Sequence, residues 1–170
     1  MRLFPTLPAA TALVAIAGCA KKAPEQLPPA PQETPTADTS AQDPNAGVPQ
    51  PGSQEHFRSN ISSDRILFDT DQSEVDAEDQ ATLRSQATYL RQYAQVRVTI
   101  EGHADERGTR EYNLALGERR ANAAKNYLVS LGIPESRVST ISFGKERPEA
   151  TGSDESAWAQ NRRAVTVTVQ

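Results

Sequence analysis

Three side chains in one short stretch, Asp105, Asn113 and Arg120, are of the types that bind a small zwitterion. A guanidinium offers a carboxylate two parallel hydrogen bonds, and a carboxylate in turn binds an ammonium group. Asn113, Leu116 and Arg120 recur at helical spacing, so they share one face of an expected helix, and Asp105 lies in the charged turn before it. The sequence therefore predicts a cleft for a ligand that carries both a carboxylate and an ammonium.

Arg120 lies inside an otherwise apolar stripe of this expected helix. The other members of the stripe recur at helical spacing and are Leu116, Ala123, Ala124, Tyr127, Leu128 and Leu131. A guanidinium in such a place is costly unless partners meet it. Two interpretations are open: Arg120 pairs with an acid of its own chain, such as Asp105 or Glu101, or it binds a carboxylate from outside.

Other kinds of chemistry find little support in the residues. His103 and His56 are the only histidines, and Asp69 and Asp71 are not followed by the glycine and closing glutamate of a calcium loop. The acids of residues 101–106 are offered as a catalytic acid and base, but no nucleophile motif or metal-ligand set accompanies them. We therefore expect a binding protein without metal or cofactor, and not an enzyme.

Four segments carry a resemblance to a known family. EGHADERGTREYN at 101–113 and LGERRANA at 116–123 resemble the peptidoglycan-binding motif of OmpA-like domains, and specifically that of the peptidoglycan-associated lipoproteins. SFGKERP at 142–148 and NRRAV at 161–165 match further motifs in the expected order. The resemblance covers roughly residues 60 to 170.

The resemblance implies a ligand and the residues that bind it. The family binds the peptide stem of peptidoglycan through meso-diaminopimelate, and Asp105 and Arg120 match its two principal contacts. The other matching positions are Asn113, Leu116, Arg107, and Phe68 with Asp69 on the loop after the first strand.

The resemblance also implies partners. They are peptidoglycan and TolB, with TolA as a further candidate, in the Tol-Pal system that acts in envelope integrity and cell division. A plain wall anchor without Tol partners is the nearest alternative. The wall-binding half of a flagellar stator is a weaker one, because it needs a membrane-spanning helix that the sequence does not show.

The first residues read as an export signal. Arg2 precedes a small apolar run, and Ile16-Ala-Gly-Cys19 resembles the lipobox at which a lipoprotein signal peptide is cleaved. We expect residues 1–18 to be the signal peptide and Cys19, the lone cysteine, to carry lipid. Ala20 follows it, which by analogy with enterobacterial sorting favours anchoring in outer-membrane lipid on the periplasmic face.

Residues 19–56 and 57–170 differ sharply in composition. The first segment is rich in Pro, Ala, Gln and Thr with almost no apolar residue to bury, so we expect a disordered linker. The second alternates predicted strands (65–68, 96–100, 138–143, 163–169) with predicted helices (76–93, 111–131, 154–160). This order predicts a two-layer α/β sandwich with a mixed sheet. The net charge of −4 does not suggest a nucleic-acid partner.

Overall fold

The computed structural model of the chain describes residues 49–169. The predicted signal peptide, Cys19 and most of the predicted linker lie outside the described residues. The elements follow in the order α1 (Gln54–Ser59), β1 (Arg65–Leu67), α2 (Ala77–Gln92), β2 (Arg97–His103), α3 (Arg110–Ser130), the 3₁₀ helix η1 (Glu135–Arg137), β3 (Val138–Gly144), α4 (Glu155–Asn161) and β4 (Arg163–Val169). Within this range no helix has the length and apolar character needed to cross a bilayer.

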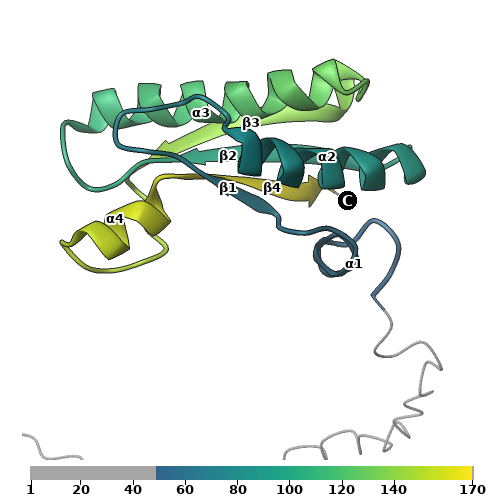
Figure 1. Cartoon of the computed structure of the whole chain (residues 1–170), viewed down its shortest axis with the longest axis horizontal. Coiled ribbons are helices and arrows are strands. Elements are labelled where there is room, and N and C mark those ends of the chain that lie inside the picture. The colour runs from purple at the N-terminus through teal and green to yellow at the C-terminus, as the bar shows by residue number, and fades with distance from the viewer. Residues whose placement is uncertain (1–48, 170) are drawn as a thin grey trace, which may run out of the picture. The chain divides into compact units, whose positions relative to one another are not determined.

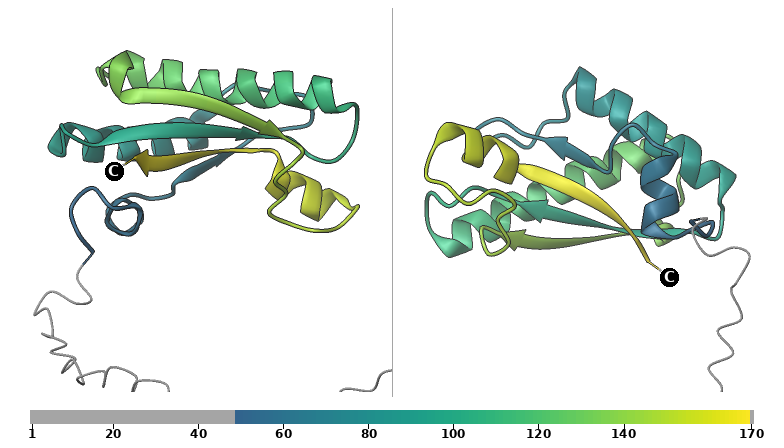
Figure 2. Two further views of the ribbon diagram at one scale, coloured as in Figure 1. Left: turned by 180° about the vertical axis from the view of Figure 1, so that it is seen from behind. Right: turned by 90° about the horizontal axis from the view of Figure 1, so that it is seen from below.

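The four strands form one mixed sheet in the order β1-β4-β2-β3. β2 is parallel to β3, whereas β4 is antiparallel to both β1 and β2. Helices α2 and α3 cover one face of the sheet, and the short helices α1 and α4 lie at opposite ends of its β1–β4 side (Figure 1; Figure 2, right). The predicted two-layer α/β sandwich with a mixed sheet is confirmed.

The central strand β2 shows why two layers form. Val98 and Ile100 point into the helix layer and are buried, whereas Arg97 is exposed and Thr99 and Glu101 are half-buried. This alternation covers one face of the sheet and leaves the other wetter. The core on the helix side joins side chains from both helices and all four strands: Ile66, Phe68, Leu83, Ala87, Leu90, Val98, Ile100, Ala121, Ala124, Leu128, Val138 and Ala164.

Side-chain caps fix where the two long helices begin. The Asp76 carboxylate accepts the backbone N–H of Asp79 at 2.8 Å, and the Thr109 hydroxyl accepts that of Tyr112 at 3.2 Å. Each cap satisfies a donor that the first turn of a helix leaves free. Helix α3 therefore starts at Arg110, directly after the charged turn that holds Asp105, and the predicted spans of both helices are confirmed to within a residue or two.

Strand β2 runs further than the sequence predicted. It reaches His103, so Gly102 belongs to the strand, and the predicted end of the strand at residue 100 is wrong. The reason is a close backbone approach: a Cβ on Gly102 would overlap the carbonyl group of Gly117 on helix α3. Two glycines thus let α3 lie directly against the end of β2, which fixes the height of the α3 side chains above the sheet.

The folded region also begins earlier than the predicted boundary at residue 57. Ser53 caps helix α1, and Phe57 on that helix is completely buried. The Gln54 side chain accepts the N–H of Thr168 at 2.7 Å and donates to the carbonyl of Thr166 at 3.1 Å. Residues 54–56 therefore belong to the domain and not to the linker.

The contact between Gly102 and Gly117 predicts a large loss of stability for Gly102→Ala. The added methyl group must push α3 away from β2, which we expect to cost about 3 kcal/mol in the free energy of unfolding. Gly132→Ala is the matched control, because Gly132 has a φ of +89° but no atom within 4 Å of the position that the added methyl group would take; it should cost only about 1–2 kcal/mol of backbone strain. Urea unfolding measures both, and equal losses would contradict the close approach.

Candidate functional site

A cleft of about 280 Å³ lies at the end of the sheet where β2 passes into the turn before α3. Its lining residues come from the loop after β1, from that turn and from the first half of α3: Thr70, Asp71, Asp105, Arg107, Gly108, Tyr112, Asn113, Leu116 and Arg120. The structure thus brings together Asp105, Arg107, Asn113, Leu116 and Arg120, as the sequence predicted. Phe68 and Asp69 line a neighbouring hollow of about 730 Å³, which shares Thr70 with the cleft.

Arg120 lies at the floor of the cleft and is 0% exposed. Its guanidinium donates to three backbone carbonyls: Nε to Gln72 at 2.8 Å, Nη1 to His103 at 2.8 Å and Nη2 to Asp69 at 3.0 Å. In the described part of the chain it forms no ion pair with Asp105 or Glu101, so the interpretation that it pairs with one of these acids is wrong. Those carboxylates are engaged by other side chains.

The three carbonyl bonds leave Arg120 with the groups that a carboxylate needs. A guanidinium has five N–H donors, one on Nε and two on each Nη. Because each nitrogen spends one donor on a carbonyl, one N–H remains on Nη1 and one on Nη2. Burial lowers the pKa of Arg120 to about 10, which still leaves it charged at neutral pH. The floor of the cleft therefore carries a positive charge that forms no ion pair within residues 49–169.

Asp105 lies above this floor and is bound by Arg107. Arg107 donates from Nη2 to one carboxylate oxygen at 2.7 Å, and from Nε and its backbone N–H to the other, both at 3.1 Å. Arg162 adds a weaker contact, with its Nη1 at 3.6 Å. Burial alone would raise the pKa of Asp105, but the Arg107 hydrogen bonds and the two nearby positive charges outweigh it and hold the pKa below its ordinary value. Asp105 is therefore an anion, and its principal partner is Arg107.

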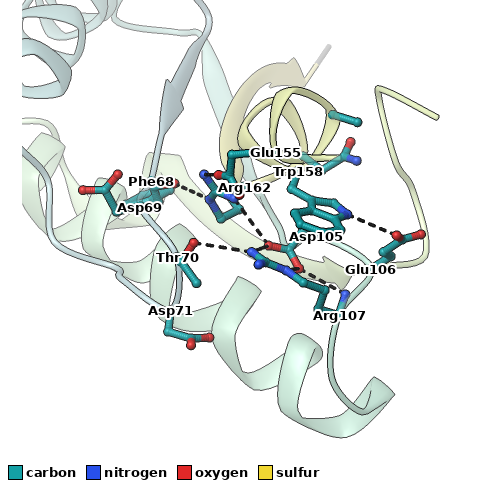
Figure 3. A network of polar contacts seen from close by, with 12 residues as sticks. Phe68, Asp69, Thr70, Asp71, Asp105, Glu106, Arg107, Glu155, Trp158 and Arg162 are labelled. Atoms are coloured by element: carbon teal, nitrogen blue, oxygen red, sulfur yellow. Dashed lines mark hydrogen bonds and ion pairs between the residues drawn. The ribbon is translucent and has the colours of Figure 1, made fainter. Parts of the chain in front are cut away.

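Contacts with Asp105, Trp158 and Thr70 fix the guanidinium of Arg107 at the entrance of the cleft. It lies 4.2 Å from the centre of the Trp158 ring on α4, and its Nη2 also reaches the Thr70 hydroxyl at 3.4 Å (Figure 3). Trp158 is itself oriented by a hydrogen bond from its indole N–H to Glu106 at 3.1 Å. Sequence reasoning did not find Trp158, because nothing local indicates that α4 folds back onto the turn.

Arg162 links the cleft to the neighbouring hollow. Its Nε donates to the carbonyl of Phe68 at 2.9 Å, and its Nη2 pairs with Glu155 at 2.7 Å. The side chain is almost fully buried between Asp105 and the strand β1 (Figure 3). Arg162 is not among the site residues predicted from the sequence, and its contact with Asp105 places it in the candidate site.

Two predicted site residues shape the cleft from helix α3. The amide nitrogen of Asn113 donates to the carbonyl of Arg107 at 2.6 Å, which fixes the turn that carries Arg107. Leu116 is 3% exposed and supplies an apolar wall one helical turn before Arg120. In this structure Asn113 thus acts on the turn, whereas Leu116 lies where the aliphatic part of a ligand would pack.

A second contact closes the cleft, and the sequence did not indicate it. The hydroxyl of Tyr112 donates to Asp71 at 3.0 Å, which joins the first turn of α3 to the loop after β1. Asp71 has a φ of +57°, a conformation that costs energy for a residue with a side chain. Tyr112 is 45% exposed and lines the cleft at its rim.

Comparisons with known proteins agree with this architecture. The model of the OmpA family matches residues 67–162. The peptidoglycan-associated lipoprotein of Mesorhizobium japonicum is 52% identical over 162 residues, which cover 95% of this chain and 90% of that protein. The peptidoglycan-associated lipoprotein of Rhizobium meliloti is 52% identical over 163 residues, covering 96% of this chain and 86% of the relative.

Solved structures show the same fold. The crystal structure of the peptidoglycan-associated lipoprotein from Burkholderia pseudomallei aligns with a TM-score of 0.62 at 44% identity, covering 64% of this chain and 92% of that one. The cell wall anchor of the T6SS from Pseudomonas aeruginosa aligns with a TM-score of 0.56 at 23% identity, covering 71% of this chain and 100% of that chain.

His103 connects the site to the stability of the domain. Its backbone carbonyl binds Arg120, whereas its ring is 2% exposed, stacks on Phe143 with centroids 5.6 Å apart, and lies 3.7 Å from Glu101. Burial, followed by the charges of Arg163 and Arg147, lowers the pKa of His103 to about 4. The imidazole is therefore neutral in the folded protein at pH values where an unfolded chain would protonate it.

This depressed pKa predicts how acid affects folding. The stabilisation of the neutral His103 is complete above pH 6.5 and is lost as the pH falls towards about 4, by up to about 3 kcal/mol. The variant His103→Leu removes this titration. Burial raises the pKa of Asp79 to about 6, which stabilises the fold as the pH falls, but this effect is the same in the wild type and in His103→Leu. The difference between their free energies of unfolding should thus shift in favour of the variant between pH 7 and pH 4. Parallel pH profiles in chemical unfolding would contradict this.

Proposed function

The chain belongs to the peptidoglycan-associated lipoproteins of the OmpA family, and from that premise we propose that its cleft binds the peptide stem of peptidoglycan through meso-diaminopimelate. The protein is then a binding module and not an enzyme. One observation carries the proposal: Arg120 is buried and charged, and it keeps one N–H on each Nη for an incoming carboxylate. This pair of donors matches a carboxylate bound by two parallel hydrogen bonds.

The rest of the ligand follows from the chemistry of the cleft. The side chain of meso-diaminopimelate ends in one carboxylate and one ammonium on the same carbon. With the carboxylate on Arg120, the ammonium faces Asp105, which is the negative group of the cleft wall beside the turn. The methylene groups then pack on Leu116. Non-covalent binding of this kind attaches the protein to the wall without changing the wall chemically.

We expect Asp105→Asn and Arg120→Lys each to weaken binding to purified sacculi by at least about tenfold. Asn keeps the shape of Asp105 without its charge, and Lys keeps the charge of Arg120 without the planar fork of donors. Co-sedimentation with sacculi measures the binding, and thermal unfolding checks the fold, because Arg120 also holds three carbonyls.

Arg119→Ala is the matched control, since Arg119 is the preceding residue of the same helix and is exposed. It should bind sacculi as the wild type does. Undiminished binding by folded Asp105→Asn or Arg120→Lys would contradict the proposed site, and release of soluble wall fragments by the wild type would point to an enzyme instead.

The position where the chain enters the domain suits an anchored protein. Residues Gln50 to Gly52 lie beside Val96 and Val169, at the end of the sheet opposite to the cleft (Figure 1). We propose that residues 1–18 are a lipoprotein signal peptide, that Cys19 carries the lipid, and that the following segment tethers the domain to the outer membrane. A tether that starts at this end leaves the cleft free to face the wall.

Cys19→Ala should abolish this anchoring. Without the thiol no acyl chain can be attached, and the remaining chain has little to hold it in a bilayer. Membrane fractionation of cells and labelling with radioactive palmitate measure the effect. We expect the wild type to be labelled and to sediment with outer membranes and Cys19→Ala to do neither; membrane association without label would contradict the proposed anchor.

We propose in addition that the protein acts in the Tol-Pal system, with TolB, and TolA as a further candidate, as partners in envelope integrity and cell division. The support is the family membership, and the surface expected for TolB overlaps the cleft. A measured affinity for TolB separates this role from that of a plain wall anchor.

A further inference from the structure

Arg107 occupies the place that the ammonium of a ligand must take. Its guanidinium and backbone N–H together contact both carboxylate oxygens of Asp105, at 2.7 and 3.1 Å. The only other cation within 4 Å of that carboxylate in the described part of the chain is Arg162, at 3.6 Å. An ammonium that takes over this ion pair must therefore displace the Arg107 side chain.

Side-chain contacts across the cleft also cover Arg120. The guanidinium of Arg120 lines the cleft but is 0% exposed. Two contacts bridge the cleft above it, from Arg107 to the Thr70 hydroxyl at 3.4 Å and from Tyr112 to Asp71 at 3.0 Å. Both join the α3 side of the cleft to the loop after β1. The movement of Arg107 that frees Asp105 also removes one of these two bridges.

The charges in the cleft decide which ligand can cause this movement. Among the lining residues Arg107 and Arg120 face Asp105 and Asp71, and Arg162 behind Asp105 is paired with Glu155, so positive and negative charges in the free cleft balance. A ligand that brings only an ammonium adds a further cation and leaves the donors of Arg120 without a partner. A ligand that also brings a carboxylate supplies a counterion for Arg120 and for the displaced Arg107.

We propose, on the basis of the proposed function, that Arg107 is a specificity-determining residue of the cleft. In the free protein its guanidinium pairs with the Asp105 carboxylate. Only a ligand whose ammonium is accompanied by a carboxylate displaces it from Asp105. The displaced guanidinium stays within the cleft, where it faces that carboxylate. Arg107 thereby distinguishes diaminopimelate from lysine, which has the same terminal ammonium but no carboxylate beside it.

The surroundings of Arg107 suit such a movement. Its side chain is 39% exposed, so it can leave Asp105 without losing water. The ring of Trp158 at 4.2 Å offers its face to the guanidinium, and the negative charges of Glu155 and Asp71 also raise the pKa of Arg107, after the larger effect of the Asp105 hydrogen bond. Asp105, in contrast, stays fixed in the wall with Arg162 behind it.

Two synthetic stem peptides test the inference. They are identical except that one contains meso-diaminopimelate and the other lysine at the third position. Their affinities are measured by isothermal titration calorimetry for the wild type, Arg107→Ala, Arg107→Gln and Arg110→Ala. Arg110 is the matched control, because it is an exposed arginine three residues away that pairs with Glu146 at 3.2 Å and does not line the cleft.

We expect the wild type to prefer the diaminopimelate peptide strongly. Arg107→Ala should bind the lysine peptide at least about tenfold tighter than the wild type does, because its ammonium no longer competes with a guanidinium. The affinity for the diaminopimelate peptide should change by only a fewfold, since the variant loses both a competitor and a contact with the carboxylate. Arg107→Gln should behave in the same way, and Arg110→Ala like the wild type.

Three results would overturn the inference. If Arg107→Ala loses affinity for the diaminopimelate peptide and gains none for lysine, Arg107 is an ordinary ligand contact. If Arg107→Ala binds both peptides more tightly by the same factor, Arg107 competes with the ligand ammonium but does not distinguish the two peptides. If the wild type binds neither peptide, the proposed function fails together with the inference, and this outcome is distinct from the first two.

Trp158 offers an independent signal, because it is the single tryptophan of the chain and stacks on Arg107. Displacement of Arg107 should change its fluorescence when the wild type is saturated with the diaminopimelate peptide. The change should be absent in Arg107→Ala. An identical change in that variant would contradict the movement of Arg107.

Discussion

The three hydrogen bonds of Arg120 to backbone carbonyls are the interaction on which the site depends. They tie the end of β2 at His103 to the loop after β1 at Asp69 and Gln72, with a side chain that comes from α3. Carbonyl dipoles satisfy the donors of a buried guanidinium, but they do not neutralise its charge. The same residue therefore builds the walls of the cleft and leaves in its floor a positive charge that a ligand carboxylate can neutralise.

The fold serves to hold Arg120 at this depth. Gly102 and Gly117 let helix α3 contact strand β2 at backbone distance, and the Ser142 hydroxyl on β3 donates to the carbonyl of Leu114 at 2.7 Å. Helix α4 supports the turn before α3 through Trp158, whose ring stacks on Arg107. Because strands and helices meet here at close range, the position of the guanidinium is set by the backbone and not by flexible side chains.

The sequence predicted the sandwich and most of the lining of the cleft, since both follow from local patterns. Alternation in the strands and the helical spacing of Leu116 and Arg120 both act within a few residues. Contacts between distant segments could not be read in this way. The Arg107–Trp158 stack joins two segments far apart in the chain, and helix α1 has a polar sequence whose single anchor, Phe57, gives no periodic signal. The carbonyl partners of Arg120 are invisible in a sequence, because every residue has a carbonyl.

A crystal structure of the protein with a diaminopimelate-containing stem peptide tests the central claim most directly. The account predicts the ligand carboxylate on Nη1 and Nη2 of Arg120, with the three carbonyl bonds retained and the ammonium at Asp105 in place of the Arg107 guanidinium. A complex in which the peptide binds elsewhere, while Arg120 remains closed beneath an undisturbed Arg107–Asp105 pair, would contradict it.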